Sequence, residues 1–137
     1  MLGVDGAIAA AAGLDALILP GGLGGPDTLR KSAAAVRLVR DTARAGKAIG
    51  VICHGPWLLI DAEVLAGRTL TCVPQLSADV VNAGARYVDE DVHVDRDGYL
   101  LISSRDHDTA GAFADALVRE LGDAGPRRAP APDWPAT

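Results

Sequence analysis

Residues 48–56 read Ala-Ile-Gly-Val-Ile-Cys-His-Gly-Pro and contain, in order, the signals for a strand, a sharp turn and the start of a helix. The apolar run before Cys53 is short and ends in the β-branched residues Val51 and Ile52, which is typical of a strand buried on both faces. Pro56 suits the first turn of a helix, because the N–H that it lacks would have no partner there. We expect this helix to continue to Ala66, with Gly67 directly after its end. The stretch therefore predicts a strand–turn–helix unit with a cysteine at the turn.

Cys53 is the candidate nucleophile of the chain. A thiol at this corner would face the N–H groups and the positive dipole end of the following helix, and both favour the thiolate. This is the geometry of a nucleophile elbow, with sulfur in place of the usual serine oxygen. The alternative is a buried structural thiol, because unpaired cysteine is among the most buried residue types. The position at a helix start, next to His54, favours the reactive thiol.

Strands and helices alternate on either side of this unit. Residues 14–19 predict a buried strand ended by Pro20, and Asp27 is a good N-cap for a helix that we expect to reach Ala45. Further downstream the patterns predict a strand at 69–73, a short helix at 75–82, strand pieces at 86–88 and 92–94, a hairpin turn at 95–98 leading into 99–103, and an amphipathic helix at 109–121. This alternation predicts an α/β fold with a mostly parallel sheet.

The loop after the first of these strands is rich in glycine. Residues 21–26 read Gly-Gly-Leu-Gly-Gly-Pro, so the backbone can adopt positive φ and approach a ligand closely. Nucleotide binding is not favoured, because the third glycine of a dinucleotide fingerprint and the glycine before the lysine of a P-loop are both missing. The alternative is that N–H groups around Gly21 and Gly22 bind an oxyanion. Because sites form at the carboxyl ends of parallel strands, we expect this loop and Cys53 to border one pocket.

The composition describes a single acidic domain. The chain has 137 residues, a net charge of −5 and 49% apolar residues, which is enough for one core. The acidic balance argues against nucleic acid or an anionic membrane surface as the main partner, and no segment approaches the ~20 apolar residues of a membrane helix. The N-terminus lacks the basic region of a signal peptide, so the cytoplasm is the expected location. We expect one domain at residues 1–121 and a disordered tail, rich in proline and alanine, at 122–137.

The other thiol and the other imidazoles are weaker candidates. Cys72 lies within a predicted strand and is expected to be inert, and a disulfide with Cys53 would remove the elbow thiol from use. His93 alternates with valines and is expected to face solvent, while His107 lies in a polar loop that caps the last helix. The spacings match no metal motif, so we expect no metal and no cofactor.

The elbow and the glycine loop together resemble the ThiJ/PfpI family, part of the class I glutamine-amidotransferase-like superfamily. The matching pieces stand in family order at residues 14–22, 26–30, 45–47, 52–57, 67–71, 82–85 and 103–105. The motif Cys-His-Gly-Pro, which begins at Cys53, is specific to the PfpI branch. An amidotransferase subunit would need a downstream His-x-Glu motif, and the sequence has none.

The resemblance implies a flavodoxin-like three-layer sandwich that assembles into dimers or hexamers. Cys53 would be the nucleophile and His54 its acid/base partner, while the N–H groups of Gly22 and His54 would hold an oxyanion. An acidic residue after the glycine loop, here Asp27, would reach the histidine of a neighbouring subunit, a role compatible with capping a helix. Family members are described as cysteine peptidases, cofactor-free glyoxalases and protein deglycases, so the implied substrate is a small aldehyde or a peptide.

The sequence departs from the family pattern at its start. Family members have a further strand–helix–strand unit before the piece that residues 3–15 match, and that unit carries an acid that hydrogen-bonds the nucleophilic thiol. We therefore expect the domain to be incomplete at its N-terminus, with apolar sheet surface exposed or covered by a partner. The leading hypothesis is a Cys53-dependent enzyme that acts on a carbonyl. The alternative is a non-catalytic remnant, or a redox-sensing or chaperone-like stress protein.

Overall fold

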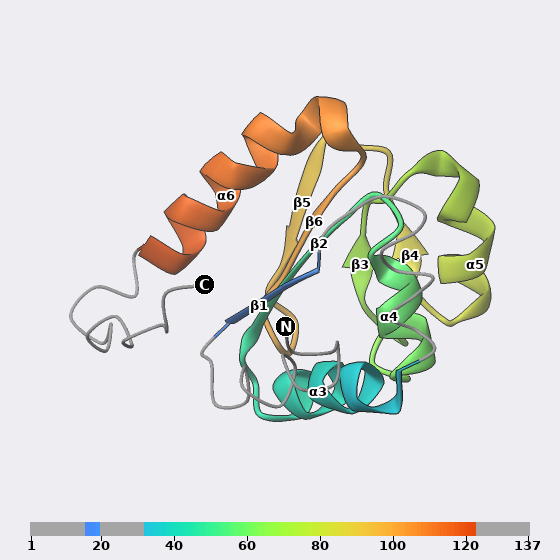
Figure 1. Cartoon of the computed structure of the whole chain (residues 1–137). Helices are drawn as coiled ribbons and strands as arrows, with labels where there is room; N and C mark the ends of the chain where they lie inside the picture. Colours follow the sequence, from blue (N-terminus) through green and yellow to red (C-terminus); the bar gives the residue numbers. More distant parts are fainter. Residues whose placement is uncertain (1–15, 20–31, 123–137) are drawn as a thin grey trace.

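A four-stranded sheet forms the centre of the computed structural model, which describes residues 16–19 and 32–122 (Figure 1). Its strands, in spatial order, are β1 (Ala16–Leu19), β2 (Ala48–Ile52), β6 (Leu101–Ser104) and β5 (Val92–Asp95). The first three run parallel, and β5 pairs antiparallel with β6 through a hairpin. The predicted α/β fold with a mostly parallel sheet is confirmed.

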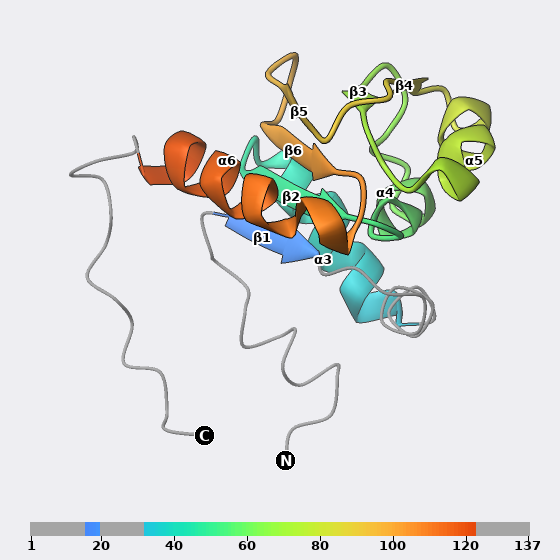
Figure 2. The same cartoon turned by 90° about the horizontal axis from the view of Figure 1, so that it is seen from above.

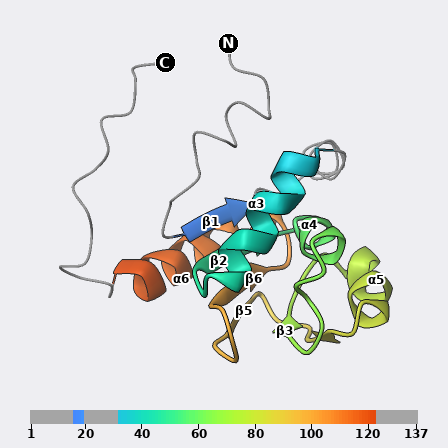
Figure 3. The ribbon, with the colours of Figure 1, turned by 90° about the horizontal axis from the view of Figure 1, so that it is seen from below.

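Helices cover both faces of the sheet and give three layers. Helix α6 (Ala110–Gly122) packs on one face, and α3 (Ala33–Arg44) and α4 (Pro56–Asp61) share the core on the other. In keeping with this, α6 is nearer the viewer in Figure 2 and α3 is nearer the viewer in Figure 3, which looks from the opposite side.

A smaller unit lies beyond α4. It contains a two-stranded parallel sheet, β3 (Thr69–Leu70) with β4 (Arg86–Tyr87), and helix α5 (Ser77–Asn82). Single 3₁₀ turns, η1 (Pro74–Leu76) and η2 (His107–Thr109), precede α5 and α6. The predicted short helix and the predicted last helix are therefore both present.

Strand β2 separates the two cores. All five of its residues are buried, as its unbroken apolar run predicts. Ile49 and Val51 belong to the core under α3 and α4, whereas Ile52 belongs to the core under α6. Gly50 also faces α6, because a Cβ there would lie 3.0 Å from Cδ2 of Leu117. The missing side chain lets α6 approach the strand closely.

Two predicted helices have different ends in the structure. Ser32 is extended and its hydroxyl accepts a hydrogen bond from the N–H of Ala35, so α3 starts after Ser32 and is not continuous from the region of Asp27. Helix α4 ends at Asp61 instead of Ala66. Glu63 adopts a positive φ of 59°, which turns the chain out of the helix and allows Leu65 to enter the core.

Strand β3 is also shorter than predicted, so Cys72 lies just after it and not in mid-strand. The hairpin predicted at residues 95–98 connects β5 and β6 as expected. In the described part of the chain, no helix has both the length and the apolar composition needed to cross a membrane.

Candidate active site

Cys53 lies at the turn between β2 and α4, as the sequence predicts. Its φ is +57°, a left-handed conformation that residues other than glycine adopt rarely. Such a conformation costs on the order of 1–3 kcal/mol, and it persists where the surrounding structure fixes it. The side chain is half-buried and is not joined to Cys72 in a disulfide. The strained turn therefore presents a reduced thiol at the end of a fully buried strand.

Hydrogen bonds on both sides fix this turn. The N–H of Cys53 donates to the carbonyl of Ser104 at the end of β6, at 3.2 Å, and the Cys53 carbonyl accepts from Val73 at 3.4 Å. The N–H of Gly55 donates back to the Ile52 carbonyl at 2.9 Å. The His54 N–H has no backbone acceptor among the described residues. These bonds thus fix the backbone of Cys53, and within the described part of the chain the neighbouring His54 N–H is left without a backbone partner.

Gly55 brings the end of β1 against the turn. A Cβ on Gly55 would lie 3.1 Å from the Ile52 carbonyl oxygen and 3.2 Å from that of Leu19, closer than side chains normally approach backbone. Leu19 is the last residue of β1 and is in register with Val51 of β2. The carboxyl ends of β1 and β2 therefore lie at the same edge of the sheet, while the glycine loop that is expected to border the pocket of Cys53 lies outside the described residues.

The His54 ring lies against Trp57. The two ring centroids are 5.1 Å apart and the ring planes are inclined by 52°. Nδ1 of His54 is buried and has no hydrogen-bond partner among the described residues. A buried imidazole nitrogen without a partner is unfavourable, so this atom is a natural place for an acceptor or donor from elsewhere. Trp57 was not singled out as a site residue from the sequence.

The end of β6 supplies further polar groups at this edge. The Ser104 hydroxyl is buried and hydrogen-bonds the Thr109 hydroxyl, while the Arg105 guanidinium pairs with Asp91 at 2.8 Å and Asp89 at 2.9 Å. Sequence reasoning did not identify these groups as neighbours of the elbow. Only the pairing of β2 with β6 brings them there, and no local signal encodes that pairing.

The other candidates from the sequence lie apart from the elbow or have simpler roles. Cys72 is fully buried, and burial, followed by the nearby charge of Asp79, raises the pKa of its thiol to about 12. His93 was expected to face solvent; it is partly exposed and hydrogen-bonds Glu90. His107 is exposed in the turn that caps α6. Within residues 16–19 and 32–122, no group of three His, Cys, Asp or Glu side chains could hold a metal ion.

Three of the predicted site residues lie outside the described residues. These are Gly21 and Gly22 of the glycine loop and Asp27, which the resemblance assigns to a neighbouring site. The predicted tail also lies outside, apart from Gly122. The described part of the site therefore consists of Cys53, His54 and the groups that surround them.

The fold is a three-layer α/β sandwich with a mostly parallel sheet, as in flavodoxin-like proteins. It carries a cysteine on a strained turn between a strand and a helix, as in a nucleophile elbow. The model of the DJ-1/PfpI family matches residues 2–120. The chain belongs to this family, as its motifs predict.

Relatives and solved structures agree with this assignment. The chain is 47% identical over 108 residues to protein/nucleic acid deglycase 2 of Escherichia coli, and the match covers 79% of this chain and 61% of that protein. It is 41% identical over 99 residues to general stress protein 18 of Bacillus subtilis, covering 72% and 56%. The crystal structure of Drosophila melanogaster DJ-1beta has a TM-score of 0.74 and 35% identity, covering 83% of this chain and 61% of that one. The chain thus spans less than two thirds of each of these relatives.

Proposed function

We propose that the protein is a cysteine-dependent enzyme of deglycase type that acts on carbonyl groups through the Cys53 thiolate. The observation that carries the proposal is the left-handed φ of +57° at Cys53, on a turn held by hydrogen bonds to two other segments. Strained residues of this kind cluster at active sites, because the strain presents a reactive group in a fixed direction. The chain's likeness to a relative named protein/nucleic acid deglycase 2 supports the choice of substrate chemistry.

The proposed reaction begins with attack of the thiolate on an aldehyde or acyl carbon. A carbon–sulfur bond forms, and the carbonyl π electrons move to oxygen. The N–H of His54, which has no backbone acceptor among the described residues, would donate to that oxyanion together with the N–H of Gly22. The His54 side chain, which would take the thiol proton, would return it to the oxyanion of an aldehyde adduct to give a thiohemiacetal. With an acyl substrate the oxyanion would instead collapse, the carbon–nitrogen bond would break, and the proton would go to the leaving amine; water would then hydrolyse the thioester and free the Cys53 thiol.

The proposed partner of His54 is the Asp27 carboxylate of a second subunit in a dimer or hexamer. Its support is the buried Nδ1 atom of His54, which has no hydrogen-bond partner in the described residues. A carboxylate on this nitrogen would fix the tautomer and orientation of the ring and stabilise its protonated form. The same aspartate can cap a helix in its own subunit.

The direct test is turnover of methylglyoxal, and of a peptide carrying a methylglyoxal adduct, by the full chain. Cys53→Ala should reduce both to background, whereas Cys72→Ala, which removes the buried thiol, should retain activity if the variant folds. Equal activity in the wild type and in Cys53→Ala would refute the proposal. Circular dichroism of each variant shows whether the fold is intact.

A redox-sensing role is the second candidate. It is favoured by the relative named general stress protein 18 and by the half-buried position of Cys53. In this case the wild type would show no turnover, and dilute peroxide would convert Cys53 to a sulfenic acid that mass spectrometry detects. Turnover that depends on Cys53 supports the enzyme over the sensor.

A further inference from the structure

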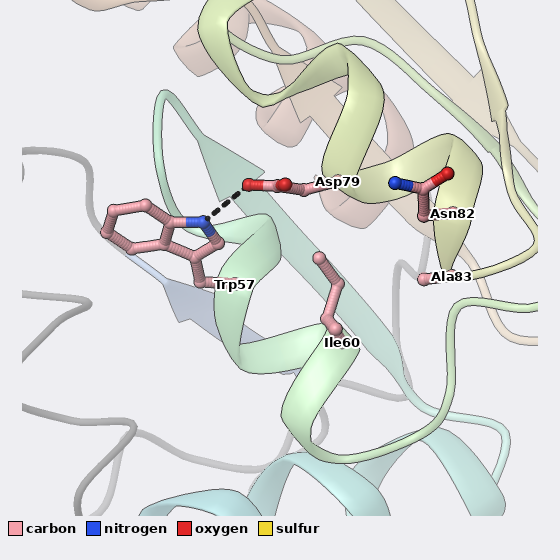
Figure 4. Close-up of a pocket in the computed structure, with 5 residues that line it drawn as sticks. All are labelled: Trp57, Ile60, Asp79, Asn82 and Ala83. Carbon is pink, nitrogen blue, oxygen red and sulfur yellow. Dashed lines mark hydrogen bonds between the residues drawn. The ribbon is translucent and has the colours of Figure 1, made fainter.

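A groove lies between α4 and α5. It has a volume of about 410 Å³ and is lined by Trp57, Ile60, Asp79, Asn82 and Ala83. Binding pockets for small molecules typically measure about 300–1,000 Å³, so the groove can hold one side chain or a small ligand. Figure 4 shows Trp57 and Ile60 extending from α4, and Asp79, Asn82 and Ala83 facing them from α5 and its C-terminal end.

The groove has the chemistry of a site for a basic side chain. Asp79 is the one charged residue among the described residues that line it, and it stands beside an indole ring. The indole N–H of Trp57 donates to Oδ2 of Asp79 at 3.4 Å, which holds the carboxylate next to the ring (Figure 4). A carboxylate can accept several hydrogen bonds, so acceptor capacity remains for a ligand. A guanidinium or ammonium group would gain both an ion pair and a cation–π contact there.

Trp57 connects this groove to the elbow. Its ring contacts the His54 ring at 5.1 Å, and its backbone N–H donates to the His54 carbonyl at 3.1 Å. Trp57 stands only four positions after Cys53, in the first turn of α4. Trp57 therefore contacts both the histidine next to Cys53 and the carboxylate in the groove.

We propose that Trp57 and Asp79 form a specificity subsite that binds a basic side chain of an amino-acid or peptide substrate. The inference rests on the proposed function for the identity of the reacting group at Cys53. The subsite itself depends only on the groove and its lining, so its binding can be measured without turnover.

The experiment measures binding of two matched probes to the full chain carrying Cys53→Ala and Trp134→Phe. Trp57 is then the remaining tryptophan, since the sequence has two, and its fluorescence reports on the groove. The probes are N-acetyl-arginine amide and N-acetyl-citrulline amide, which have nearly the same shape and differ in charge. We expect the arginine probe to bind about fivefold more tightly, as one partly exposed ion pair allows, and the preference to shrink as salt is raised.

Asp79→Asn, which keeps the size of the side chain, should abolish the preference for arginine over citrulline. Asp115→Asn is the matched control, because it removes the same charge from an exposed position on α6 and should leave the preference unchanged. Equal affinity for the two probes in the parent protein, or a preference that survives Asp79→Asn, would overturn the subsite.

Turnover measurements distinguish failure of the subsite from failure of the proposed function. If the enzyme is active, adducts on peptides with a neighbouring arginine should have a higher kcat/KM than those with citrulline, and Asp79→Asn should remove the difference. If the arginine preference in binding is present but no substrate is turned over, the subsite stands and the proposed function fails. If turnover is present and the probes bind equally, the subsite fails and the proposed function stands.

Discussion

At the scale of single residues, the two cysteines show how the fold assigns different chemistry to the same side chain. Cys53 is half-buried on a strained turn, whereas Cys72 is fully buried in the core that α3 and α4 share. Burial raises the pKa of Cys72 to about 12, so that thiol stays protonated throughout the neutral range. Only the thiolate is a good nucleophile, and access to reagent favours Cys53 as well.

Alkylation measures this difference directly. We expect iodoacetamide at about pH 7 to label Cys53 at least tenfold faster than Cys72 in the folded protein, because accessible thiolates react and buried thiols do not. Peptide mapping by mass spectrometry at several times gives both rates. The two rates should become similar in urea, where both thiols are exposed. Equal, slow labelling of both thiols in the native protein would contradict a reactive Cys53.

Gly55 offers a second prediction at this scale. A methyl group there would meet two backbone carbonyl oxygens at 3.1 and 3.2 Å, and backbone moves less readily than a flexible side chain. We expect Gly55→Ala to lower the free energy of unfolding by about 1–3 kcal/mol. Gly111→Ala is the control, because Gly111 lies in α6 with nothing within 4 Å of the new methyl group. That change should raise stability by about 0.5–1 kcal/mol. Urea unfolding of both variants provides the comparison.

At the scale of elements, the parts predicted well are those with strong local patterns. Strand β2 is an unbroken apolar run, and the hairpin at residues 95–98 carries a dense turn signal. The end of α4 was predicted wrongly. Gly67 suggested that the helix continues to Ala66, but it ends five residues earlier, at Asp61. The decisive contact is distant in sequence. The Tyr99 hydroxyl donates to the Val64 carbonyl at 2.8 Å, and Leu65 enters the core.

In the candidate site, too, features encoded by neighbouring residues could be predicted, whereas contacts between distant residues could not. The place of Cys53 and His54 on a strand-to-helix turn could be predicted because the apolar run, the cysteine and the proline are neighbours in the sequence. The contact between Trp57 and Asp79 joins residues 22 positions apart, and the contact of Cys53 with Ser104 depends on pairing between strands. Such contacts follow from the assembled sheet and leave no periodic or local trace in the sequence.

A buried ion pair joins Arg68, directly before β3 of the smaller sheet, to Asp95, the last residue of β5. Nε of Arg68 lies 3.0 Å from Oδ2 of Asp95, and the same oxygen accepts from the Thr69 N–H at 2.7 Å. Burial opposes ionisation of Asp95, but hydrogen bonds from Thr69, Asp97 and Arg68 outweigh it, so the pKa of the carboxyl is lowered. The Arg68 guanidinium also stacks on Tyr99, 4.0 Å from the ring centroid. The network is therefore expected to depend on the charge of Asp95.

The sign of the pH dependence follows from the lowered pKa. The unfolded state binds the proton of Asp95 more tightly than the folded state does, so protonation favours unfolding. The stabilisation is complete above the unfolded pKa of about 3.9 and is lost as the pH falls through the lower folded value. We expect Asp95→Asn to cost about 3 kcal/mol at neutral pH, because the buried Arg68 loses its charged partner. This cost should begin to shrink as the pH falls below about 4, where the carboxyl of the unfolded chain takes up its proton, and should shrink further as the pH passes the lower pKa of the folded state.

Urea unfolding at neutral pH and at several lower pH values measures both quantities. Asp91→Asn is the control, because it removes a carboxylate from an exposed pair with Arg105 and should cost at most about 1 kcal/mol. A loss in Asp95→Asn that is the same at every pH would show that the charge of Asp95 is not what stabilises the network.

At the scale of the whole molecule, the question is whether one chain can complete its own site. His54 Nδ1 is buried without a hydrogen-bond partner in the described part of the chain, and the proposal assigns it the Asp27 carboxylate of another subunit. An aspartate that acts within its own subunit and one that acts across an interface give different results when two inactive variants are mixed.

The test mixes Cys53→Ala with Asp27→Ala after unfolding them together and refolding them. Each variant alone should have little activity, but a mixed oligomer contains sites that combine an intact Cys53 with an intact Asp27 from the neighbour. With random mixing of dimers, about one site in four should be complete, so activity should return to about a quarter of the wild-type value. Refolding each variant separately before mixing is the control and should restore nothing while the oligomers do not exchange subunits. If both variants are inactive alone and co-refolding restores no activity, Asp27 does not act across the interface, and the partner of His54 has to be sought within its own subunit.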